Sequence, residues 1–400
     1  MSPPRDPDSR ALRRYGRDLV EKARRREPAG ERGRAPHGGD EAPPEAPAGL
    51  LEWSEEELER LPPREKHGRR RSDAAHRRAA RAVAGAPVEA SVDDAPPGRV
   101  GFVVATSRGP CEVELPDGTR TLAQLPKALA RDDRSLLAVG DEVELALRPN
   151  GDLVVAKRLP RRSRLARPDP FQPHRERVLV ANLDLGIVVA SLRHPPLTTG
   201  LVDRFLVALE HGGIAPAIAV NKIDLGADDP SACRALDLLA PYRELGLPVA
   251  LCSARTGEGL ETVRGWLAGR TAAFVGHSGV GKSSLVNALV PGAGAVTGEV
   301  AAGRGKGRHT TSQARVYRLP GGGRLVDTPG VREFGLWRLA PRELAVYFDE
   351  FEPFAAECRF SDCSHVHEPD CGVRAAAGRS AIAPERFATY LRILESFERD

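Results

Sequence analysis

Residues 276–283 read GHSGVGKS, which matches the phosphate-loop pattern GxxxxGK[ST]. The apolar run TAAFV at 271–275 precedes the motif and the helix-like run SLVNALV at 284–290 follows it, which is the strand–loop–helix context the motif needs. Glycines let backbone N–H groups surround phosphates at a helix N-terminus, while Lys282 reaches the β- and γ-phosphates and Ser283 binds Mg²⁺. The stretch predicts a nucleotide phosphate site formed by Gly276, His277, Ser278, Gly279, Val280, Gly281, Lys282, Ser283 and Ser284.

A second motif, NKID at 221–224, stands at the end of the apolar run APAIAV, where α/β sheets place their ligand-binding loops. The carboxylate of Asp224 suits the N1–H and 2-amino groups of guanine, and adenine would leave it unpaired. Asn221 is expected to brace this loop. Ser253 and Ala254 follow the run PVALC and fit the short loop whose backbone contacts the guanine carbonyl. The remaining predicted GTP contacts are Lys222, Ile223, Thr310, Asp327 and Gly330.

The order of these motifs along the chain is unusual. In ordinary GTPases the phosphate loop comes first, followed by a switch threonine, DxxG, NKxD and SA. Here NKID and SA precede the phosphate loop, and DTPG at 327–330 follows it. The order predicts a circularly permuted GTPase domain with an unchanged pocket and displaced chain ends.

Residues 300–313, VAAGRGKGRHTTSQ, are the predicted switch loop, which orders around the γ-phosphate and Mg²⁺. Thr310 or Thr311 should touch the metal. We favour Thr311, although spacing alone leaves both open. With Ser283, this threonine completes the predicted magnesium site.

The residue after DTPG is Val331, so the glutamine that orients water in Ras-like enzymes is missing from its usual place. We therefore expect slow intrinsic hydrolysis. His309 is the candidate catalytic residue beside Lys282 and Thr311, with His277 as a second candidate. The alternative is that either histidine only contacts phosphate or solvent.

A third constellation lies near the C-terminus, where the spacing is C-x₄-C-x-H-x₅-C. Three thiolates and one imidazole within a short segment suit a tetrahedral structural zinc site, which leaves no open catalytic position. His367 is expected to be a solvent-exposed bystander. The predicted zinc ligands are Cys358, Cys363, His365 and Cys371.

Composition gives broader limits. The chain has 400 residues, a formal net charge of +4 and 41% hydrophobic residues. Its apolar runs are strand-sized, none approaches the roughly 20 residues of a membrane span, and the charged N-terminus lacks a secretory apolar run. These features predict a cytoplasmic protein with no membrane partner, expected to be a monomer.

Pattern changes divide the chain. Residues 1–95 are Pro-rich and basic with little aliphatic periodicity, which predicts disorder. Residues 96–162 hold short strands and turns typical of an OB-type β-barrel, with sandwiches and other barrels as alternatives. Residues 161–177 are interpreted as a linker. Residues 176–335 alternate strands and helices, the pattern of the α/β GTPase domain, and residues 336–400 form a small helical zinc-binding domain.

Taken together, the motifs resemble the RsgA (YjeQ) family of small-ribosomal-subunit biogenesis GTPases over about residues 98–397. The resemblance rests on the order of a barrel, NKID, SA, the phosphate loop, GRHTTS, DTPGVREFG and the Cys₃His spacing. It implies a GTPase that binds the small ribosomal subunit and its 16S rRNA late in assembly and leaves on hydrolysis. It also implies a structural zinc, a barrel that contacts rRNA, and a catalytic role for His309.

Two features depart from the family pattern. His277 stands where the family usually has glutamine or another polar residue, and the tail before residue 95 is long. The basic run at 64–81 carries eight basic and two acidic residues, a charge of 8 − 2 = +6, and is either an RNA tether or a solvated tail. Two other functions stay open: a regulatory switch acting on a protein partner, and an RNA-binding scaffold that holds GTP structurally.

Overall fold

The computed structural model describes residues 88–89, 99–107, 109–126, 137–169, 175–226, 230–295, 314–320, 322–327, 336 and 339–397. The predicted disorder of 1–95 and the basic run at 64–81 therefore lie outside the described residues, apart from 88–89. Within the described ranges, no helix combines the length and apolarity needed to cross a membrane.

An antiparallel sheet with the order β1-β6-β5-β2-β3-β4 forms the N-terminal part of the described chain. A parallel bridge between Gln124, just after β4, and Val154 of β6 joins the two sides, so that strands β2 to β6 close into a barrel. Val103, Val113, Val143 and Val155 are 0% exposed in its interior. The strands are β1 (Val88–Glu89), β2 (Arg99–Ala105), β3 (Cys111–Glu114), β4 (Arg120–Ala123), β5 (Glu142–Leu147) and β6 (Leu153–Arg158).

The segment after the barrel is more ordered than the predicted linker. Strands β7 (Arg164–Pro168) and β8 (Glu176–Ala181) pair antiparallel within it. Leu165 is the buried apolar residue of β7. Because Pro and Arg residues surround it in the sequence, the composition did not indicate a strand.

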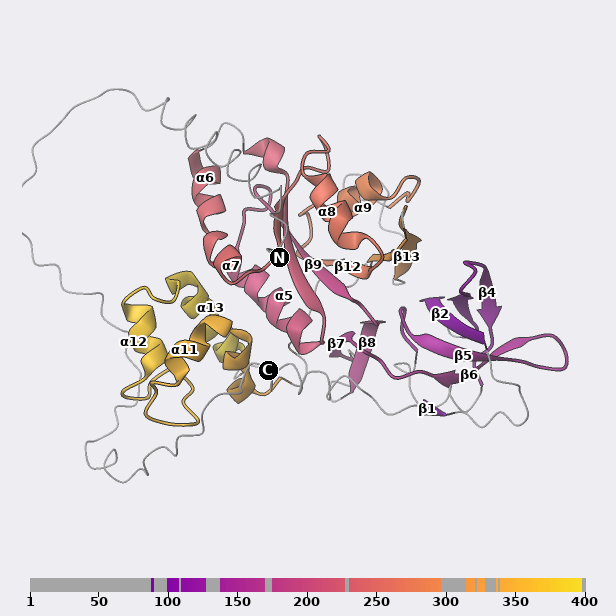
Figure 1. Cartoon of the computed structure of the whole chain (residues 1–400), viewed down its shortest axis with the longest axis horizontal. Coiled ribbons are helices and arrows are strands. Elements are labelled where there is room, and N and C mark those ends of the chain that lie inside the picture. Colours follow the sequence, from indigo (N-terminus) through magenta and orange to yellow (C-terminus); the bar gives the residue numbers. More distant parts are fainter. Residues whose placement is uncertain are drawn as a thin grey trace, which may run out of the picture.

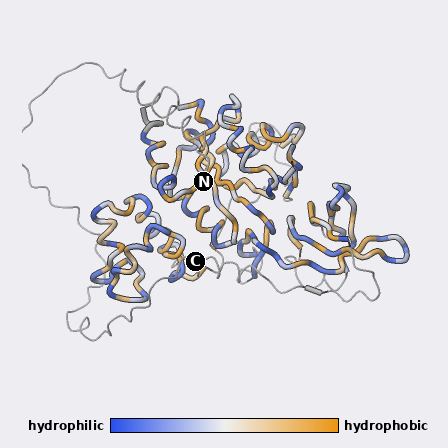
Figure 2. The backbone as a smooth tube through the Cα atoms, viewed as in Figure 1, coloured by the Kyte–Doolittle hydropathy of each residue, from blue (hydrophilic) through white to orange (hydrophobic). Residues whose placement is uncertain are grey.

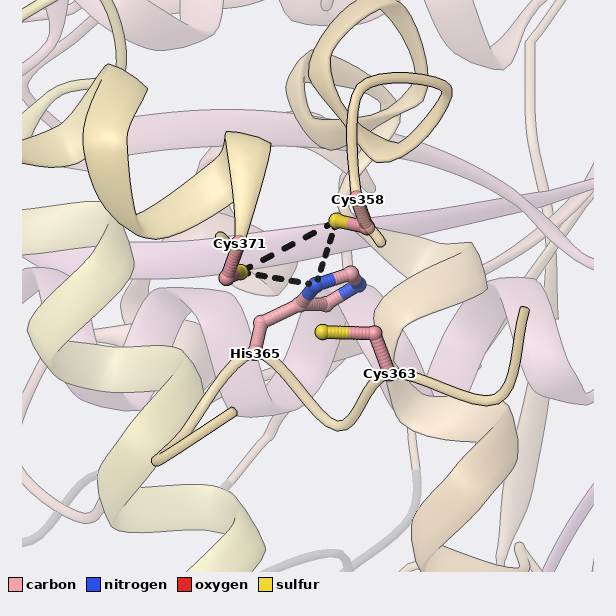
Figure 3. Close-up of side chains that lie close together, drawn as sticks. All are labelled: Cys358, Cys363, His365 and Cys371. Carbon is pink, nitrogen blue, oxygen red and sulfur yellow. Dashed lines mark hydrogen bonds between the residues drawn. The ribbon is translucent and has the colours of Figure 1, made fainter. Parts of the chain in front are cut away.

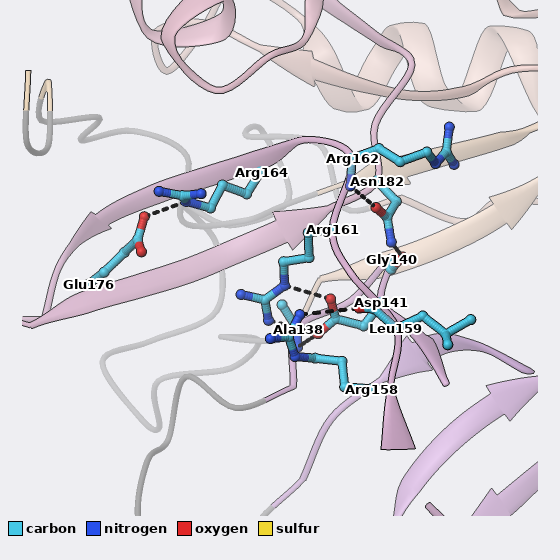
Figure 4. A network of polar contacts seen from close by, with 10 residues as sticks. All are labelled: Ala138, Gly140, Asp141, Arg158, Leu159, Arg161, Arg162, Arg164, Glu176 and Asn182. Atoms are coloured by element: carbon cyan, nitrogen blue, oxygen red, sulfur yellow. Dashed lines mark hydrogen bonds and ion pairs between the residues drawn. The ribbon is translucent and has the colours of Figure 1, made fainter. Parts of the chain in front are cut away.

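A polar network fixes the turn before β5 to this segment (Figure 4). Asp141, fully buried, receives two hydrogen bonds from Arg161, at 2.6 and 2.8 Å. The side chain of Asn182 accepts a hydrogen bond from the Arg162 backbone N–H at 2.8 Å and donates one to the Gly140 carbonyl at 2.9 Å. A buried charge is stable only when it is paired and hydrogen-bonded. These contacts therefore fix the barrel turn at residues 140–141 against residues 161–162 and Asn182.

The central sheet has the order β11-β10-β9-β12-β14-β13. Its strands are parallel except β13, which is antiparallel to β14. The bounds are β9 (Leu185–Ser191), β10 (Ala215–Asn221), β11 (Val249–Leu251), β12 (Thr271–Val275), β13 (Arg315–Arg318) and β14 (Arg324–Asp327). Strands β9 and β12 are buried along their whole length, which is why they read as continuous apolar runs.

Helices cover both faces of this sheet (Figure 1). Ile218 and Val220 of β10 face the core under α5, α6 and α7, whereas Ala217 and Ala219 face the core under α8 and α9. The sheet strands accordingly form the hydrophobic centre of the molecule (Figure 2). Each large apolar side chain buried here contributes about 1.5–3 kcal/mol. The helices are α5 (Thr199–His211), α6 (Pro230–Asp237), α7 (Ala240–Glu244), α8 (Leu260–Leu267) and α9 (Lys282–Leu289).

A C-terminal helical region packs against α5, while the barrel lies at the other side of the sheet (Figure 1). Phe348, Phe351 and Tyr390 form its aromatic core. Arg386, 5% exposed, lies 2.6 Å from Asp203 of α5 and 2.6 Å from Glu350, so it ties this region to the sheet. The elements are η2 (Pro341–Tyr347), η3 (Asp349–Phe351), α11 (Glu352–Ala355), α12 (Gly372–Gly378) and α13 (Pro384–Ser396).

Candidate nucleotide site and metal centre

The carboxyl ends of the parallel strands bring the predicted nucleotide-binding segments to one edge of the sheet. NKID begins at the last residue of β10 and continues into η1 (Ile223–Leu225). Ser253 and Ala254 follow β11, and the phosphate loop joins β12 to α9. Asp327 is the last residue of β14. Segments far apart in sequence thus meet where α/β folds bind ligands.

The phosphate loop has the backbone conformation that its glycines predict. Gly276, Gly279 and Gly281 have φ values of 144°, 84° and 96°, which L side chains rarely adopt. A Cβ on Gly281 would also lie 2.3 Å from Nδ2 of Asn221, so glycine is required there for space as well. Residues 277–279 are exposed, and Lys282, Ser283 and Ser284 are half-buried at the start of α9.

Lys282 bends back over the loop. Its Nζ donates hydrogen bonds to the carbonyl oxygens of Gly276 at 2.6 Å and His277 at 2.7 Å. Burial raises the pKa of the Asp327 carboxyl above its ordinary value, and the charges of Lys282 and Arg315 lower it by less. The Lys282 ammonium and the Asp327 carboxylate therefore lie close enough to interact electrostatically, next to the C-terminal ends of β12 and β14.

Asn221 joins the phosphate loop to the SA loop. It is 1% exposed, and its Nδ2 donates to the carbonyl oxygen of Val280 at 3.0 Å while its Oδ1 accepts from the backbone N–H of Ala254 at 3.0 Å. Lys222 adds a second link, because its Nζ donates to the carbonyl oxygens of Gly279, at 2.6 Å, and of His194. The first two residues of NKID thus connect the phosphate loop to the SA loop and to the loop that carries His194.

Asp224 is held in a fixed orientation. Ser253 Oγ donates to its Oδ1 at 2.5 Å, and Arg255 Nε donates to its Oδ2 at 2.8 Å. Burial raises the pKa of Asp224, but these hydrogen bonds and the Arg255 charge outweigh it and leave the pKa below its usual value. The side chain is therefore a carboxylate at neutral pH, with lone pairs available to N–H donors.

Several predicted site residues lie outside the described residues. These are His309, Thr310, Thr311 and Gly330, and the structure neither places them in the site nor excludes them from it. The predicted switch loop at 300–313 is outside the described ranges as well.

The four predicted metal ligands do come together (Figure 3). Their ligand atoms all lie within 4.8 Å of one another. Cys358 Sγ is 3.8 Å from Cys371 Sγ, and His365 Nδ1 lies 3.6 and 3.5 Å from those two sulfurs. Ligands about 2.3 Å (sulfur) and 2.0–2.1 Å (nitrogen) from a tetrahedral centre would be about 3.8 Å (S–S) and 3.5 Å (S–N) apart. Cys358, Cys363, His365 and Cys371 therefore form a cluster that could hold one metal ion.

The loop between these ligands is organised by Glu368. Its carboxylate accepts hydrogen bonds from the backbone N–H groups of Ser364 at 2.6 Å and Val366 at 3.1 Å. Burial raises the pKa of Glu368, but the hydrogen bonds to Ser364 outweigh it and lower the pKa to about 2. His367 is exposed, as expected for a bystander.

The sequence interpretation missed three of these residues. Arg255 could have been noticed because it follows SA directly, and Glu368 lies between the ligands His365 and Cys371. His194 contributes only a backbone carbonyl, for which a sequence carries no signal.

Comparisons with known proteins agree with this geometry. A sequence model of the family described as RsgA GTPase matches residues 158–337. The small ribosomal subunit biogenesis GTPase RsgA of Pseudomonas aeruginosa is 41% identical over 323 residues, 80% of this chain and 91% of that protein. The protein of the same name from Azotobacter vinelandii is 40% identical over 321 residues, 80% of this chain and 92% of that protein.

Two solved structures are similar to the fold. YjeQ from Thermotoga maritima has a TM-score of 0.61 and 33% identity, and the match covers 74% of this chain and 98% of that one. YloQ, described as a circularly permuted GTPase, has a TM-score of 0.60 over 78% of this chain and 98% of its own, at 22% identity. Its likeness concerns the fold alone.

Fold and site together define a phosphate-loop α/β protein in circularly permuted order, carrying a Cys₃His cluster in its C-terminal region. With 41% identity across 91% of a curated relative, the family is also established. The chain belongs to the RsgA GTPase family.

Proposed function

We propose that this chain is a GTP hydrolase that acts in the biogenesis of the small ribosomal subunit. The observation that carries the proposal is the meeting of NKID, SA, the phosphate loop and Asp327 at one edge of the sheet. Relatives that are 40–41% identical over most of the chain are named small ribosomal subunit biogenesis GTPases, which supports the ribosomal role.

The proposed guanine contacts follow from the geometry of NKID and SA. Asp224 accepts hydrogen bonds from the N1–H and 2-amino groups of the base, and the backbone of the loop at Ser253 and Ala254 meets its carbonyl. Asn221 and Ser253 hold these groups in place through the hydrogen bonds described above. Because the fixed carboxylate has no donor to match on adenine, the pocket discriminates against ATP.

The proposed chemistry is transfer of the γ-phosphoryl group to water. The water oxygen bonds to the γ-phosphorus as the bond to the β–γ bridging oxygen breaks, and GDP and inorganic phosphate leave. Lys282 neutralises charge on the phosphates, and the loop N–H groups position them. We assign His309 the role of a catalytic residue, in place of the water-orienting glutamine whose position Val331 occupies.

The donor set fits magnesium. Ser283 at the start of α9 and Asp327 at the end of β14 offer a hydroxyl and a carboxylate, the hard oxygen ligands that Mg²⁺ prefers. We propose that Thr311 supplies the switch hydroxyl. Bound Mg²⁺ supplies charge neutralisation on the β- and γ-phosphates.

We propose that the ion in the Cys₃His cluster is zinc with a structural role. Three sulfurs and a nitrogen at tetrahedral spacing suit zinc, and a fourth protein ligand leaves no open position. The packing of Phe351 and Tyr390 against His365 connects the ion to the core of the C-terminal region.

We propose that residues 96–162 are an OB-type barrel that contacts 16S rRNA, followed by a GTPase domain at 176–335 and a zinc-binding domain at 336–400. The order β2-β3-β4-β6-β5, with β4 and β6 joined by a parallel bridge, supports the OB assignment. The proposed place of action is the cytoplasm, where ribosomal subunits are assembled, and the proposed state is a monomer.

One experiment separates this function from its alternatives. GTP hydrolysis is measured for the protein alone, with purified small subunits and with purified large subunits, and Lys282→Ala serves as the inactive control. Strong stimulation by the small subunit alone supports the proposal. Stimulation by neither subunit favours a switch that acts on a protein partner, and no hydrolysis under any condition favours a GTP-holding scaffold.

A further inference from the structure

Glu114, at the end of β3 in the barrel, has a side chain that is 0% exposed and is surrounded by three arginines. Arg318 Nε and Arg324 Nε each lie 3.0 Å from its carboxylate oxygens, and Arg120 Nε lies 3.4 Å away. Burial raises the pKa of Glu114, but the hydrogen bonds from Arg318 and Arg324 outweigh it and keep the pKa below its usual value. Glu114 is therefore a buried carboxylate whose negative charge is stabilised by Arg318 and Arg324, about 200 residues further along the chain.

Two of those partners belong to the central sheet. Arg318 is the last residue of β13 and Arg324 the first of β14, so Glu114 holds the closed end of the β13–β14 hairpin. The open end of the same hairpin leads to the nucleotide site, because Asp327 ends β14 and Arg315 opens β13 just after the predicted switch loop. Within four residues, therefore, β14 runs from the barrel contact to the proposed magnesium ligand.

Further contacts clamp the hairpin to the barrel. Arg120 Nη2 donates to the carbonyl oxygen of Val316 at 3.1 Å. The guanidinium carbon of Arg324 lies 4.4 Å from the ring centre of Phe102, within range of a cation–π contact. A Cβ on Gly118 would lie 2.6 Å from Arg318 Nη1, so the barrel turn fits closely against this side chain.

The contact is specific to the pairing of opposite charges. The Glu114 side chain is 0% exposed, whereas those of Arg318 and Arg324 are 49% and 29% exposed. Removing the charge of Glu114 therefore removes the anion that holds both guanidinium groups, whereas the same substitution in a pair whose two members are exposed has little effect.

Strand β14 pairs with β12 and buries Leu325 and Val326, whereas β13 is the edge strand beside β14 and only its Val316 is buried. The Glu114 contacts add a side-chain link from the closed end of this hairpin to the barrel.

We propose that Glu114 is a positioning residue for GTP hydrolysis, which fixes the β13–β14 hairpin and with it Asp327, and so couples the barrel to the nucleotide state of the site. The inference rests on the proposed GTPase function. Glu114 does not touch nucleotide, and it acts through Arg318, Arg324 and the strand they belong to.

The test uses the full-length Glu114→Gln protein, which keeps the size of the side chain and removes its charge. Two readouts are measured: kcat and KM for GTP, and hydrogen exchange of residues 99–123 with GDP or with a slowly hydrolysed GTP analogue bound. We expect kcat to fall about tenfold with KM changed less than about twofold, because the guanine and phosphate-loop contacts are untouched. The nucleotide dependence of barrel exchange seen in the unaltered protein should be lost.

Glu142→Gln is the matched control, since Glu142 lies on β5 of the same barrel in an exposed ion pair with Arg162, and both readouts should stay unchanged. If Glu114→Gln behaves like this control, the inference is wrong. Should Glu114→Gln fail to fold, Arg318→Gln, which leaves Arg324 to pair with Glu114, must give the same two changes. If the unaltered protein hydrolyses no GTP, the proposed function fails, while the exchange measurement still decides the coupling: nucleotide-independent barrel exchange in the unaltered protein overturns it.

Discussion

Hydrogen bonds hold the Asp224 carboxylate in one orientation before any nucleotide base binds. Ser253 and Arg255 each donate a hydrogen bond to it, at 2.5 and 2.8 Å, and they orient both of its oxygens. A base whose donors match this orientation binds without reorganisation of the side chain. A base with an acceptor at the same position would be repelled by the carboxylate, because the hydrogen bonds to Ser253 and Arg255 prevent the side chain from turning away.

Asp224→Asn should therefore change which nucleotide is preferred. The amide replaces one acceptor oxygen by an NH₂ donor group, which matches the extra carbonyl of xanthine and clashes with the 2-amino group of guanine. We expect at least about a hundredfold weaker binding of GTP and tighter binding of xanthosine triphosphate, measured by competition with a fluorescent nucleotide. Ser278→Ala, in the exposed part of the phosphate loop, is a comparison variant that should leave the preference for guanine intact. Unchanged discrimination in Asp224→Asn would count against the base-reading role.

At the residue scale, sequence patterns predicted what is local. The phosphate loop, NKID, SA and the four cysteine and histidine ligands each lie in one short stretch, so their spacing alone identified them. The contact of Lys222 with Gly279 and the pairing of Arg255 with Asp224 join different loops. Nothing in a single sequence selects those partners among the many alternatives.

At the scale of elements, α5 has two different faces. Phe205 and Leu206 pack on the sheet, while Val207 belongs to the core of the C-terminal region. Glu210, near its C-terminal end, is half-buried close to Asp349 and Glu350. Burial and these two charges raise its pKa to about 8, although Arg386 opposes them.

This pKa predicts a pH-dependent contribution to stability. The folded chain holds a proton on Glu210 that the unfolded chain, with its ordinary pKa near 4.5, releases. The free energy of unfolding should therefore fall as the pH rises from about 4.5 to about 8. Glu210→Gln should remove this fall, so that the variant gains about 1–2 kcal/mol relative to the unaltered protein between pH 5 and pH 8.5.

Urea unfolding at several pH values measures the effect. Glu244→Gln, an exposed glutamate at the end of α7, is the matched control and should follow the unaltered protein. Parallel pH profiles for Glu210→Gln and the unaltered chain would show that the carboxyl is ionised throughout this range.

Elements were predictable where their patterns were strong. Strands β9 to β12 of the central sheet read as apolar runs because they are buried along most or all of their length. The β7–β8 pair was interpreted as a linker because Pro and Arg dominate its composition and only Leu165 is fully buried in β7. The ion pairs of Glu114 with Arg318 and Arg324 join residues about 200 positions apart, which no periodicity records.

At the scale of the whole molecule, the metal cluster should determine whether the C-terminal region folds. Its core is a small cluster of aromatic and aliphatic side chains, and a structural zinc contributes on the order of 10 kcal/mol. We expect one zinc per chain by native mass spectrometry. Removal of the metal by a chelator should expose residues 339–397 to protease while the barrel stays resistant.

Cys371→Ser should reproduce the effect of the chelator, and His367→Ala, at an exposed position between the ligands, should not. A C-terminal region that stays protease-resistant without metal would mean that aromatic packing alone stabilises it.

The strand order of the central sheet has a consequence for synthesis of the chain. The barrel closes from contiguous residues and is complete once β6 has left the ribosome. Strand β9, by contrast, pairs early with β10 on one side, while its other neighbour, β12, is made only after β11 and α8. An open, apolar strand edge therefore persists while residues 192–275 are made, and this edge is where a chain stalled or truncated in that interval should aggregate.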